Sequence, residues 1–143
     1  MARVAIICDT HIGVRNDSAV FGEYLDRSFD WFFSRLDEEN IKTVLHLGDL
    51  FDRRKFINYV TAGRARDKFL KPLEDRGIIT HIIAGNHDVY WKNTNEVNSL
   101  DELVTGRYKN INVHINPVLL NIDGLDIQMM PWICPINSQK SYD

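Results

Sequence analysis

The chain has 143 residues, of which 44% are hydrophobic and 26% are charged. This length fits one ordinary domain or a compact part of a larger one, and the composition excludes a disordered or fibrous protein. The 17 Lys and Arg against 20 Asp and Glu give a formal net charge of -3, which argues against a globally basic nucleic-acid binder. The N-terminal apolar run at 4–8 is too short for a signal peptide or a membrane span, so we expect a cytoplasmic protein with no membrane association.

Three short apolar runs predict strands of a buried sheet. The runs lie at 4–8, 43–47 and 78–84, and each is closed by polar and glycine residues. A continuous apolar run of this length is typical of a strand that is covered on both faces, as in a parallel sheet.

Helical patterns fill the two gaps between these runs. In the segment 23–40, apolar residues recur at helical spacing and form one stripe, made of Leu25, Phe29, Phe32 and Leu36. The second helix is expected from Asn58, a suitable N-cap, to Gly77, a suitable residue just past a helix end, with a bend at Pro72. The alternation of strands and helices predicts an α/β fold built from βαβ units.

The pattern changes after the third run. A short helix is expected from Ser99, as its cap, to Val104. Three short strands are expected at 112–115, 118–122 and 125–130. Asp123-Gly124 is a hairpin signal between the last two strands.

A polar cluster follows each of the three buried runs. The clusters are Asp9-Thr10-His11 with Gly13, Gly48-Asp49-Leu50-Phe51-Asp52, and Gly85-Asn86-His87-Asp88. Because parallel strands point the same way, the clusters should meet at the carboxyl edge of the sheet, where open α/β sheets bind ligands. Asp, His and Asn suit Mn²⁺, Fe²⁺ or Zn²⁺, and carboxylates can bridge two ions, so the set predicts a two-metal site.

The three clusters, in this order, resemble the signature of calcineurin-type metallophosphoesterases. Within that superfamily the chain resembles the SbcD-like nuclease subunit of a double-strand-break repair complex, especially its bacteriophage recombination-endonuclease versions. The residues behind this narrower resemblance are His11-Ile12-Gly13-Val14, Met129-Met130-Pro131-Trp132 and the second and third clusters. The resemblance implies the α/β/β/α sandwich of metallophosphoesterases. It also implies that 1–143 is the N-terminal part of the nuclease domain, with the sandwich incomplete at the C-terminus.

The resemblance also implies roles for the clustered residues in phosphodiester hydrolysis. The expected ligands of two divalent ions are Asp9 and His11 for one, Asn86 for the other, and Asp49 as the bridge. Mn²⁺ is the first choice, with Mg²⁺, Fe²⁺ or Zn²⁺ as alternatives. His87 is expected to act on the leaving group, with Asp52 paired to it and Asp88 counted among the catalytic residues.

The later part of the chain lacks the remaining ligands that the resemblance implies. The family completes its site with a further histidine and a Gly-His-x-His motif, and nothing after Asp88 matches either. His46, His81 and His114 fall within predicted strands, whereas ligands of this family stand at strand ends, so we interpret all three as structural. With these imidazoles missing, the chain is expected to bind metal weakly.

Basic residues gather directly after the second cluster. The segment 53–76 holds eight basic and three acidic residues, a charge of +5 within a chain of net charge -3. Contact with DNA phosphates is expected for Arg53, Arg54 and Lys55, and Arg15 is added to this group; a solvated face is the alternative. Trp91, beside Tyr90, could stack on an unpaired base or pack beneath its loop.

Several partners and functions remain open at this stage. Tyr24 and Trp31 lie off the apolar stripe of the first helix, which favours a second packing partner or further core burial. The resemblance implies that this partner is a second copy of the chain, in a homodimer through the helices 23–39 and 58–76. The resemblance implies DNA and an SMC-like ATPase subunit as partners. One alternative is a phosphoprotein or small-molecule phosphoesterase, because Asp52-Arg53 resembles the phosphatases, although those enzymes continue with Gly rather than Arg54. The other is a non-catalytic DNA-binding or assembly module, which missing ligands would favour.

Overall fold

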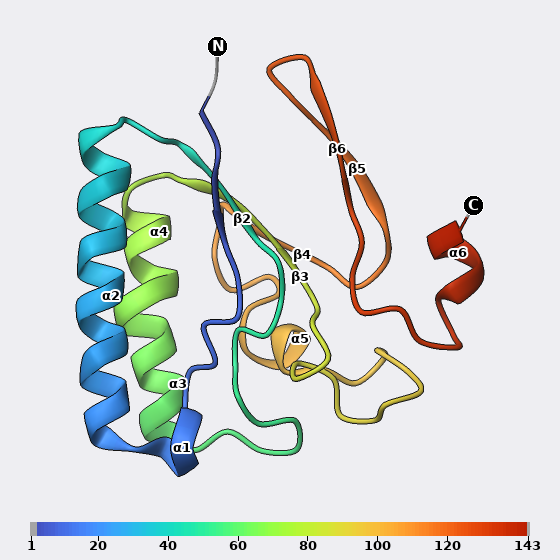
Figure 1. Ribbon diagram of the computed structural model, residues 1–143, viewed down its shortest axis with the longest axis horizontal. Coiled ribbons are helices and arrows are strands. Elements are labelled where there is room, and N and C mark those ends of the chain that lie inside the picture. The colour runs from blue at the N-terminus through green and yellow to red at the C-terminus, as the bar shows by residue number, and fades with distance from the viewer. Residues whose placement is uncertain (1–2, 143) are drawn as a thin grey trace.

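A four-stranded parallel sheet forms the centre of the computed structural model, which describes residues 3–142 (Figure 1). The strands are β1 (Ala5–Ile7), β2 (Thr43–His46), β3 (Ile79–Ile83) and β4 (Ile111–His114), and they lie side by side in chain order. Each neighbouring pair is parallel, so the predicted α/β class is confirmed. The fourth strand extends the sheet that the first three strands begin.

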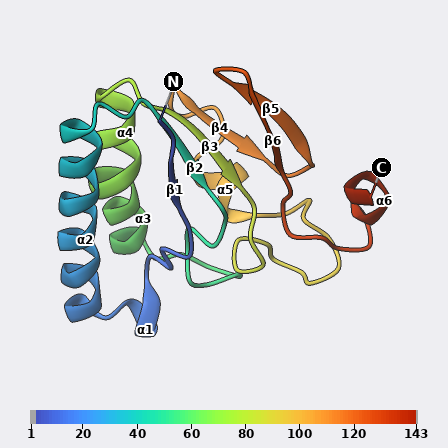
Figure 2. The same ribbon diagram turned by 45° about the horizontal axis from the view of Figure 1, so that its top comes forward.

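Helices cover one face of this sheet (Figures 1 and 2). The helix α2 spans Ala19–Glu38, and it begins before residue 23 because the Phe21 N–H donates to the side chain of Ser18 at 3.5 Å. A second helical segment comprises α3 (Tyr59–Ala65), a π-helical turn (Arg66–Leu70) and α4 (Lys71–Asp75). These elements confirm the two helices that the sequence predicts between the strands.

The ends of the second helical segment match the sequence prediction closely. The Thr61 N–H donates to Asn58 Oδ1 at 2.8 Å, as expected of an N-cap, and Gly77 has a φ of 63° just past the helix end. The π-helical turn precedes Pro72, which has no N–H to donate to the preceding turn of the helix. The irregularity predicted at the proline is therefore a π-helical turn that precedes it.

The main core lies between the helices and the sheet. Phe29 of α2 stacks on Phe69 with ring centroids 4.8 Å apart, and Phe69 also contacts the ring of His46 in β2. All three side chains are buried, as are Val44 and Leu73. Burial of this apolar surface stabilises the arrangement that holds the carboxyl ends of the strands together.

A two-stranded hairpin packs on the opposite face of the sheet. Its strands are β5 (Val118–Ile122) and β6 (Leu125–Met129), and Asp123 and Gly124 form the predicted turn with φ values of 52° and 85°. The hairpin buries Leu45, Ile83 and Met129 in a second, smaller core. It does not cover β1, where Ile6 is 63% exposed. The prediction that the first strand is buried on both faces is therefore wrong for this face.

Three short helices complete the description. They are α1 (Val14–Asp17), α5 (Ser99–Leu103) and α6 (Ser138–Tyr142). The cap of α5 is Asn98 rather than Ser99, because Asn98 Oδ1 accepts from the Asp101 N–H at 2.8 Å. Within residues 3–142 no helix combines the length and the hydropathy that crossing a membrane requires.

Candidate metal centre

The polar clusters that follow β1, β2 and β3 meet at the carboxyl edge of the sheet, as predicted. The first two run beside each other beyond their strands, since the Asp9 N–H donates to the Gly48 carbonyl at 3.1 Å and the His11 N–H donates to the Asp49 carbonyl at 3.0 Å. The third joins them through the His87 N–H, which donates to Asp49 Oδ1 at 2.8 Å. Backbone hydrogen bonds thus fix the positions from which the side chains project.

Three side chains form a group that could hold a metal ion. One ligand atom from each of His11, Asp49 and His87 lies within 4.8 Å of the other two. His11 Nε2 also lies 3.7 Å from a carboxylate oxygen of Asp9 and 3.7 Å from one of Asp49. These distances are too long for hydrogen bonds, and they suit two atoms that each lie about 2.1 Å from a common ion.

Asn86 faces the same region. It lines a hollow of about 390 Å³ together with Asp9, Asp49 and Gly85. Asp9, Asp49 and Asn86 thus offer carboxylate and amide oxygens and His11 offers a ring nitrogen, while the His87 ring lies beside the same group. This donor set fits a divalent metal ion of the borderline or hard kind.

His11 gives a second sign that the region is built for a ligand. Its Nδ1 is buried and has no hydrogen-bond partner among residues 3–142. Asp52 Oδ1 lies 3.2 Å away but without the alignment of a hydrogen bond. Both ring nitrogens of His11 therefore lie beside carboxylates without a geometrically sound hydrogen bond.

The backbone carries strain at these positions. Asp9, His11 and Asp49 have φ values of 52°, 43° and 55°, in the left-handed region that residues with a Cβ rarely adopt. Gly48 and Gly85 allow the second and third clusters to approach closely, because a Cβ on Gly48 would lie 2.7 Å from the Gly85 nitrogen. The close approach brings the second and third clusters into direct contact.

The buried carboxylate of Asp88 links the second and third clusters through hydrogen bonds to their backbone. Its Oδ2 accepts from the Asp49 N–H at 2.8 Å and from the Gly85 N–H at 2.9 Å, and its Oδ1 accepts from the Phe51 N–H at 3.4 Å. The side chain is fully buried, and burial raises the pKa of its carboxyl to about 6. Asp88, expected among the catalytic residues, is thus placed to position Asp49 rather than to touch a substrate.

Asp52 contacts His87, although not through the atom that was expected. His87 Nδ1 lies 2.6 Å from the backbone carbonyl of Asp52, whereas the Asp52 carboxylate points to His11. The Asp52 N–H is bound to the Ile12 carbonyl at 3.1 Å, which holds this stretch of backbone alongside the first cluster. The predicted pairing of the two side chains is corrected to a side-chain to backbone contact.

Comparison with known proteins shows which family the chain belongs to. The model of the calcineurin-like phosphoesterase family matches residues 2–136. The chain belongs to this family. The match includes all three polar clusters, and the parallel sheet with its helices is consistent with the metallophosphoesterase fold.

Two relatives of the chain have names that refer to DNA metabolism. The chain is 34% identical over 131 residues to "Exonuclease subunit 1" of Enterobacteria phage T4, which covers 91% of this chain and 38% of that protein. It is 35% identical over 85 residues to "DNA double-strand break repair protein Mre11" of Sulfurisphaera tokodaii, which covers 57% of this chain and 21% of that protein. The similarity thus extends over well under half of the length of either relative.

The basic residues beside the candidate metal centre differ in how far other side chains already engage them. The Arg53 side chain is already engaged, because its guanidinium donates a hydrogen bond to Asn16 and lies 3.4 Å from the Asp17 carboxylate. The guanidinium carbon also lies 4.6 Å from the centroid of the Phe56 ring. Arg54 and Lys55 have no ion pair within the described chain. They line a hollow of about 550 Å³ that also contains Asp52 and His87.

The two remaining candidate DNA contacts lie on opposite sides of these residues in sequence. Arg15 is exposed and covers the ring of Phe21 at 5.7 Å. Trp91 is 51% exposed, and its ring meets Tyr90 edge to face at 4.7 Å. Both side chains are accessible to a ligand.

His46 was expected to be structural, but its contact with Thr10 was not predicted from the sequence. His46 is fully buried; its Nδ1 accepts from the Gly48 N–H at 3.2 Å, and its Nε2 lies 3.2 Å from the Thr10 hydroxyl. Thr10 in turn donates to the Leu50 carbonyl at 3.0 Å. This chain of contacts assigns the proton of the ring to Nε2 and ties the first cluster to β2. A histidine three residues before Asp49 within an apolar run was the only signal for it.

His81 and His114 do not belong to the group formed by His11, Asp49 and His87. They sit on neighbouring strands, with His81 Nδ1 2.9 Å from His114 Nε2 and their rings stacked at 5.2 Å. Burial lowers the pKa of both rings. Their mutual hydrogen bond supports the structural role expected for them.

Proposed function

We propose that this chain is the metal-binding part of a DNA nuclease subunit that hydrolyses phosphodiester bonds in recombination, repair or replication. The observation that carries the proposal is that His11, Asp49 and His87 converge at the carboxyl edge of the sheet, so that an ion held by His11 and Asp49 would have the His87 ring beside it. The family match and the names of the two relatives point the same way.

In this proposal four side chains hold two divalent ions. They are Asp9 and His11 for one ion, Asn86 for the other, and Asp49 as the bridge. Mn²⁺ is the first candidate, ahead of Mg²⁺, Fe²⁺ or Zn²⁺. When bound, the ions would neutralise phosphate charge and acidify a water molecule that attacks the phosphorus.

His87 provides the proton for the leaving oxygen. The Asp52 carbonyl engages Nδ1 at 2.6 Å, so Nε2 is the nitrogen left to face the ligand group. A protonated imidazole held in one orientation is suited to general-acid catalysis. Asp52 and Asp88 act indirectly, by orienting His87 and Asp49.

The partners follow from the same proposal. Arg54 and Lys55 meet the DNA backbone beside His87, with a smaller contribution from Arg53 because it is already paired. A homodimer through the helices 23–39 and 58–76 is supported by the exposure of Tyr24 and Trp31 on α2. An SMC-like ATPase subunit and a location in the host cytoplasm complete the proposal.

The competing phosphoesterase interpretation loses part of its support. It relies on Arg53 as a phosphate-binding residue directly after Asp52, yet Arg53 is engaged with Asn16 and Asp17. A guanidinium that must first leave two partners is a poor phosphate clamp.

A substrate panel tests the proposal directly. The chain, and any longer natural form of it, is incubated with Mn²⁺ and end-labelled duplex DNA, a phosphopeptide or bis-p-nitrophenyl phosphate. We expect DNA cleavage that disappears on chelation and in the variant His87→Asn, while the control His114→Asn keeps it. Phosphopeptide hydrolysis without DNA cleavage would support a phosphoesterase, and DNA binding without cleavage by either form would support a non-catalytic module.

A further inference from the structure

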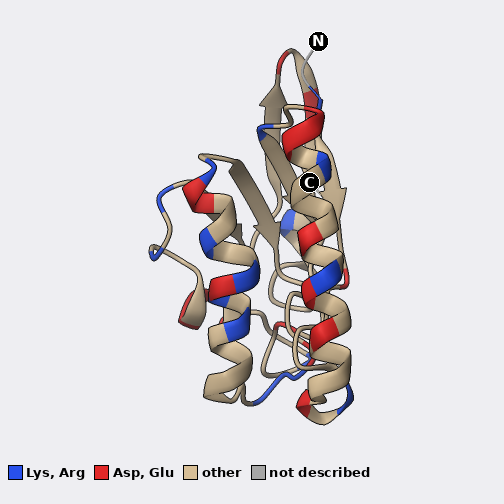
Figure 3. Ribbon diagram, turned by 90° about the vertical axis from the view of Figure 1, so that its left-hand side faces the viewer, with Lys and Arg blue, Asp and Glu red and all other residues tan. Residues whose placement is uncertain are grey.

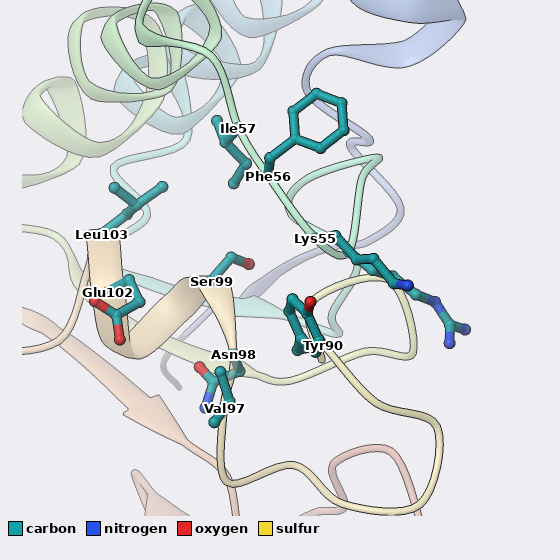
Figure 4. A pocket seen from close by; sticks show the side chains of 10 residues that line it. Lys55, Phe56, Ile57, Tyr90, Val97, Asn98, Ser99, Glu102 and Leu103 are labelled. Carbon is teal, nitrogen blue, oxygen red and sulfur yellow. The ribbon is translucent and has the colours of Figure 1, made fainter.

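A third hollow lies beside the segment Arg54–Phe56. Its volume is about 330 Å³, within the range of pockets that hold small molecules. Figure 4 shows the Tyr90 side chain between Lys55 on one side and Asn98 and Ser99 on the other. None of the expected roles of the metal centre uses this hollow.

The lining combines apolar, aromatic and cationic groups. Ile57, Val97 and Leu103 supply the apolar part, and Arg54 and Lys55 supply the positive charge. The Lys55 ammonium lies 5.7 Å from the centroid of the Tyr90 ring. A flat aromatic ring beside a cation and an apolar wall offers stacking for a planar ring that is linked to a phosphate.

Tyr90 is held in place rather than free to swing. Its N–H donates to the Val97 carbonyl at 2.9 Å, within a bridge between Val89 and Asn98, and its ring contacts Trp91 edge to face. A fixed aromatic surface loses little conformational entropy when a ring stacks on it.

One polar group in the hollow is available to a ligand. The carboxylate of Glu102 has no hydrogen-bond or ion-pair partner among residues 3–142, whereas the side chain of Asn98 is used up in capping α5. A carboxylate accepts hydrogen bonds from the amino groups on nucleobase edges.

The hollow adjoins the hollow beside the metal centre, because the two share lining residues. Arg54, Lys55 and Phe56 line both this hollow and the one that contains Asp52 and His87. A DNA strand with one phosphodiester at the metal centre would therefore carry a neighbouring phosphate past Arg54 and Lys55, and the attached base would reach Tyr90.

We propose that this hollow, the base pocket, binds one unpaired nucleobase of the strand whose phosphodiester lies at the metal centre. The proposal rests on the proposed nuclease function and deepens it, because it makes DNA ends with an unpaired nucleotide the preferred substrate class. Such a base is already free of its partner, so placing it in the pocket avoids the cost of breaking a base pair.

Equilibrium binding tests the base pocket without relying on cleavage. Fluorescence anisotropy compares a duplex that ends in one unpaired nucleotide with the same duplex carrying an abasic residue there, both with hydrolysis-resistant phosphorothioate linkages and Mn²⁺ present. We expect the whole chain to bind the DNA that has the base about five-fold or more tightly. The variant Tyr90→Leu should lose this preference, and Tyr90→Phe should keep it.

A matched control separates the pocket from general effects of tyrosine loss. Tyr142→Leu removes a tyrosine that is 78% exposed on α6, and it should leave the preference unchanged. Equal affinity of the unmodified chain for the two DNAs overturns the base pocket whether or not Tyr90→Leu folds. Equal affinity that is tight leaves the nuclease proposal standing, whereas absence of binding to either DNA overturns both.

Discussion

Single residues at the metal centre combine backbone strain with close packing. Left-handed conformations at Asp9, His11 and Asp49 cost about 1–3 kcal/mol each and persist only where neighbours hold them. The neighbours here are the Asp88 carboxylate, the two glycines Gly48 and Gly85, and the buried His46. All three strained residues carry side chains that could bind metal. The fold therefore holds these side chains in place at a cost in backbone conformational energy.

Gly85 offers the sharpest test of this packing. A Cβ at this position would overlap the carboxylate and the backbone nitrogen of Asp49. We expect Gly85→Ala to displace Asp49 and to weaken Mn²⁺ binding by about 10- to 100-fold. Isothermal titration measures the affinity. Gly63→Ala is the control, because its Cβ would meet only the flexible end of Arg66 at 3.7 Å; equal affinity of the two variants would contradict the packing argument.

His46 makes stability depend on pH. Burial lowers the pKa of the ring from 6.5 to about 4. Between these values the unfolded chain binds a proton at this residue and the folded chain does not, so the free energy of unfolding falls as the pH falls through this window. The shift corresponds to a loss of about 3 kcal/mol by the lower end.

Urea unfolding from about pH 7 to about pH 4, with a chelator present, measures this dependence. The comparison protein is His46→Gln, which keeps a donor and an acceptor without a group that titrates in this range. It should show a shallower decline than the unmodified chain. His81 and His114, whose pKa values are also lowered, contribute with the same sign in both proteins, so parallel curves would show that His46 is not responsible.

At the level of elements, the turns that follow β2 and β3 depend on one carboxylate. Asp88 accepts hydrogen bonds from the backbone of both turns, as described above. Asp88→Asn replaces one acceptor with an amide that must face a backbone N–H. We expect a loss of about 1–3 kcal/mol in the free energy of unfolding, measured in urea, together with weaker Mn²⁺ binding. Asp30→Asn on the exposed side of α2 should change neither, and a similar effect in both variants would argue against this role.

The helices and strands could be predicted from the sequence better than their surroundings could. Runs such as 43–47 and caps such as Asn58 are local signals, and the strands, helices and hairpin turn that they predicted are present. The exposure of Ile6 could not be predicted, because it depends on how far the hairpin of β5 and β6 reaches across the sheet. Whether a strand is covered is a tertiary property that its own residues do not specify.

For the candidate site, the sequence predicted which residues converge but not which of their atoms make contact. The convergence of Asp9, Asp49 and Asn86 follows from parallel strands, and they do share one hollow. The partner of His87 was predicted as the Asp52 side chain, whereas the contact runs through its carbonyl. Strand topology brings residues together, but which atom of a residue faces its neighbour depends on backbone rotation within each loop, which no motif encodes.

For the whole molecule, the arrangement of charge matters more than the net value. Figure 3 shows that the outer faces of the helices mix acidic and basic residues along their length. Many of these cations are paired, such as Arg35 with Glu38 and Arg66 with Asp67. Arg54 and Lys55, beside the metal centre, are not paired in this way, which makes them the better candidates for phosphate contacts.

Salt dependence tests this assignment. Each phosphate contact steepens the dependence of log affinity on log salt concentration by about 0.9. Replacing both Arg54 and Lys55 by alanine should therefore reduce the slope for duplex DNA by up to about 1.8. The control replaces Lys42 and Lys68, both exposed and away from the carboxyl edge of β2. An unchanged slope in the Arg54 and Lys55 variant would remove these residues from the interface.

The contacts that link the turns after β2 and β3 join residues 38 and 39 positions apart in the chain. No short fragment can therefore assemble the ligand group, and an ion that needs the whole group binds the native state far better than the unfolded chain. Mass action then couples metal binding to folding: at a metal concentration 100 times the dissociation constant, the native state gains about 2.7 kcal/mol. A thermal melt with and without Mn²⁺ would thus report occupancy of the centre even in a variant that has lost all catalysis.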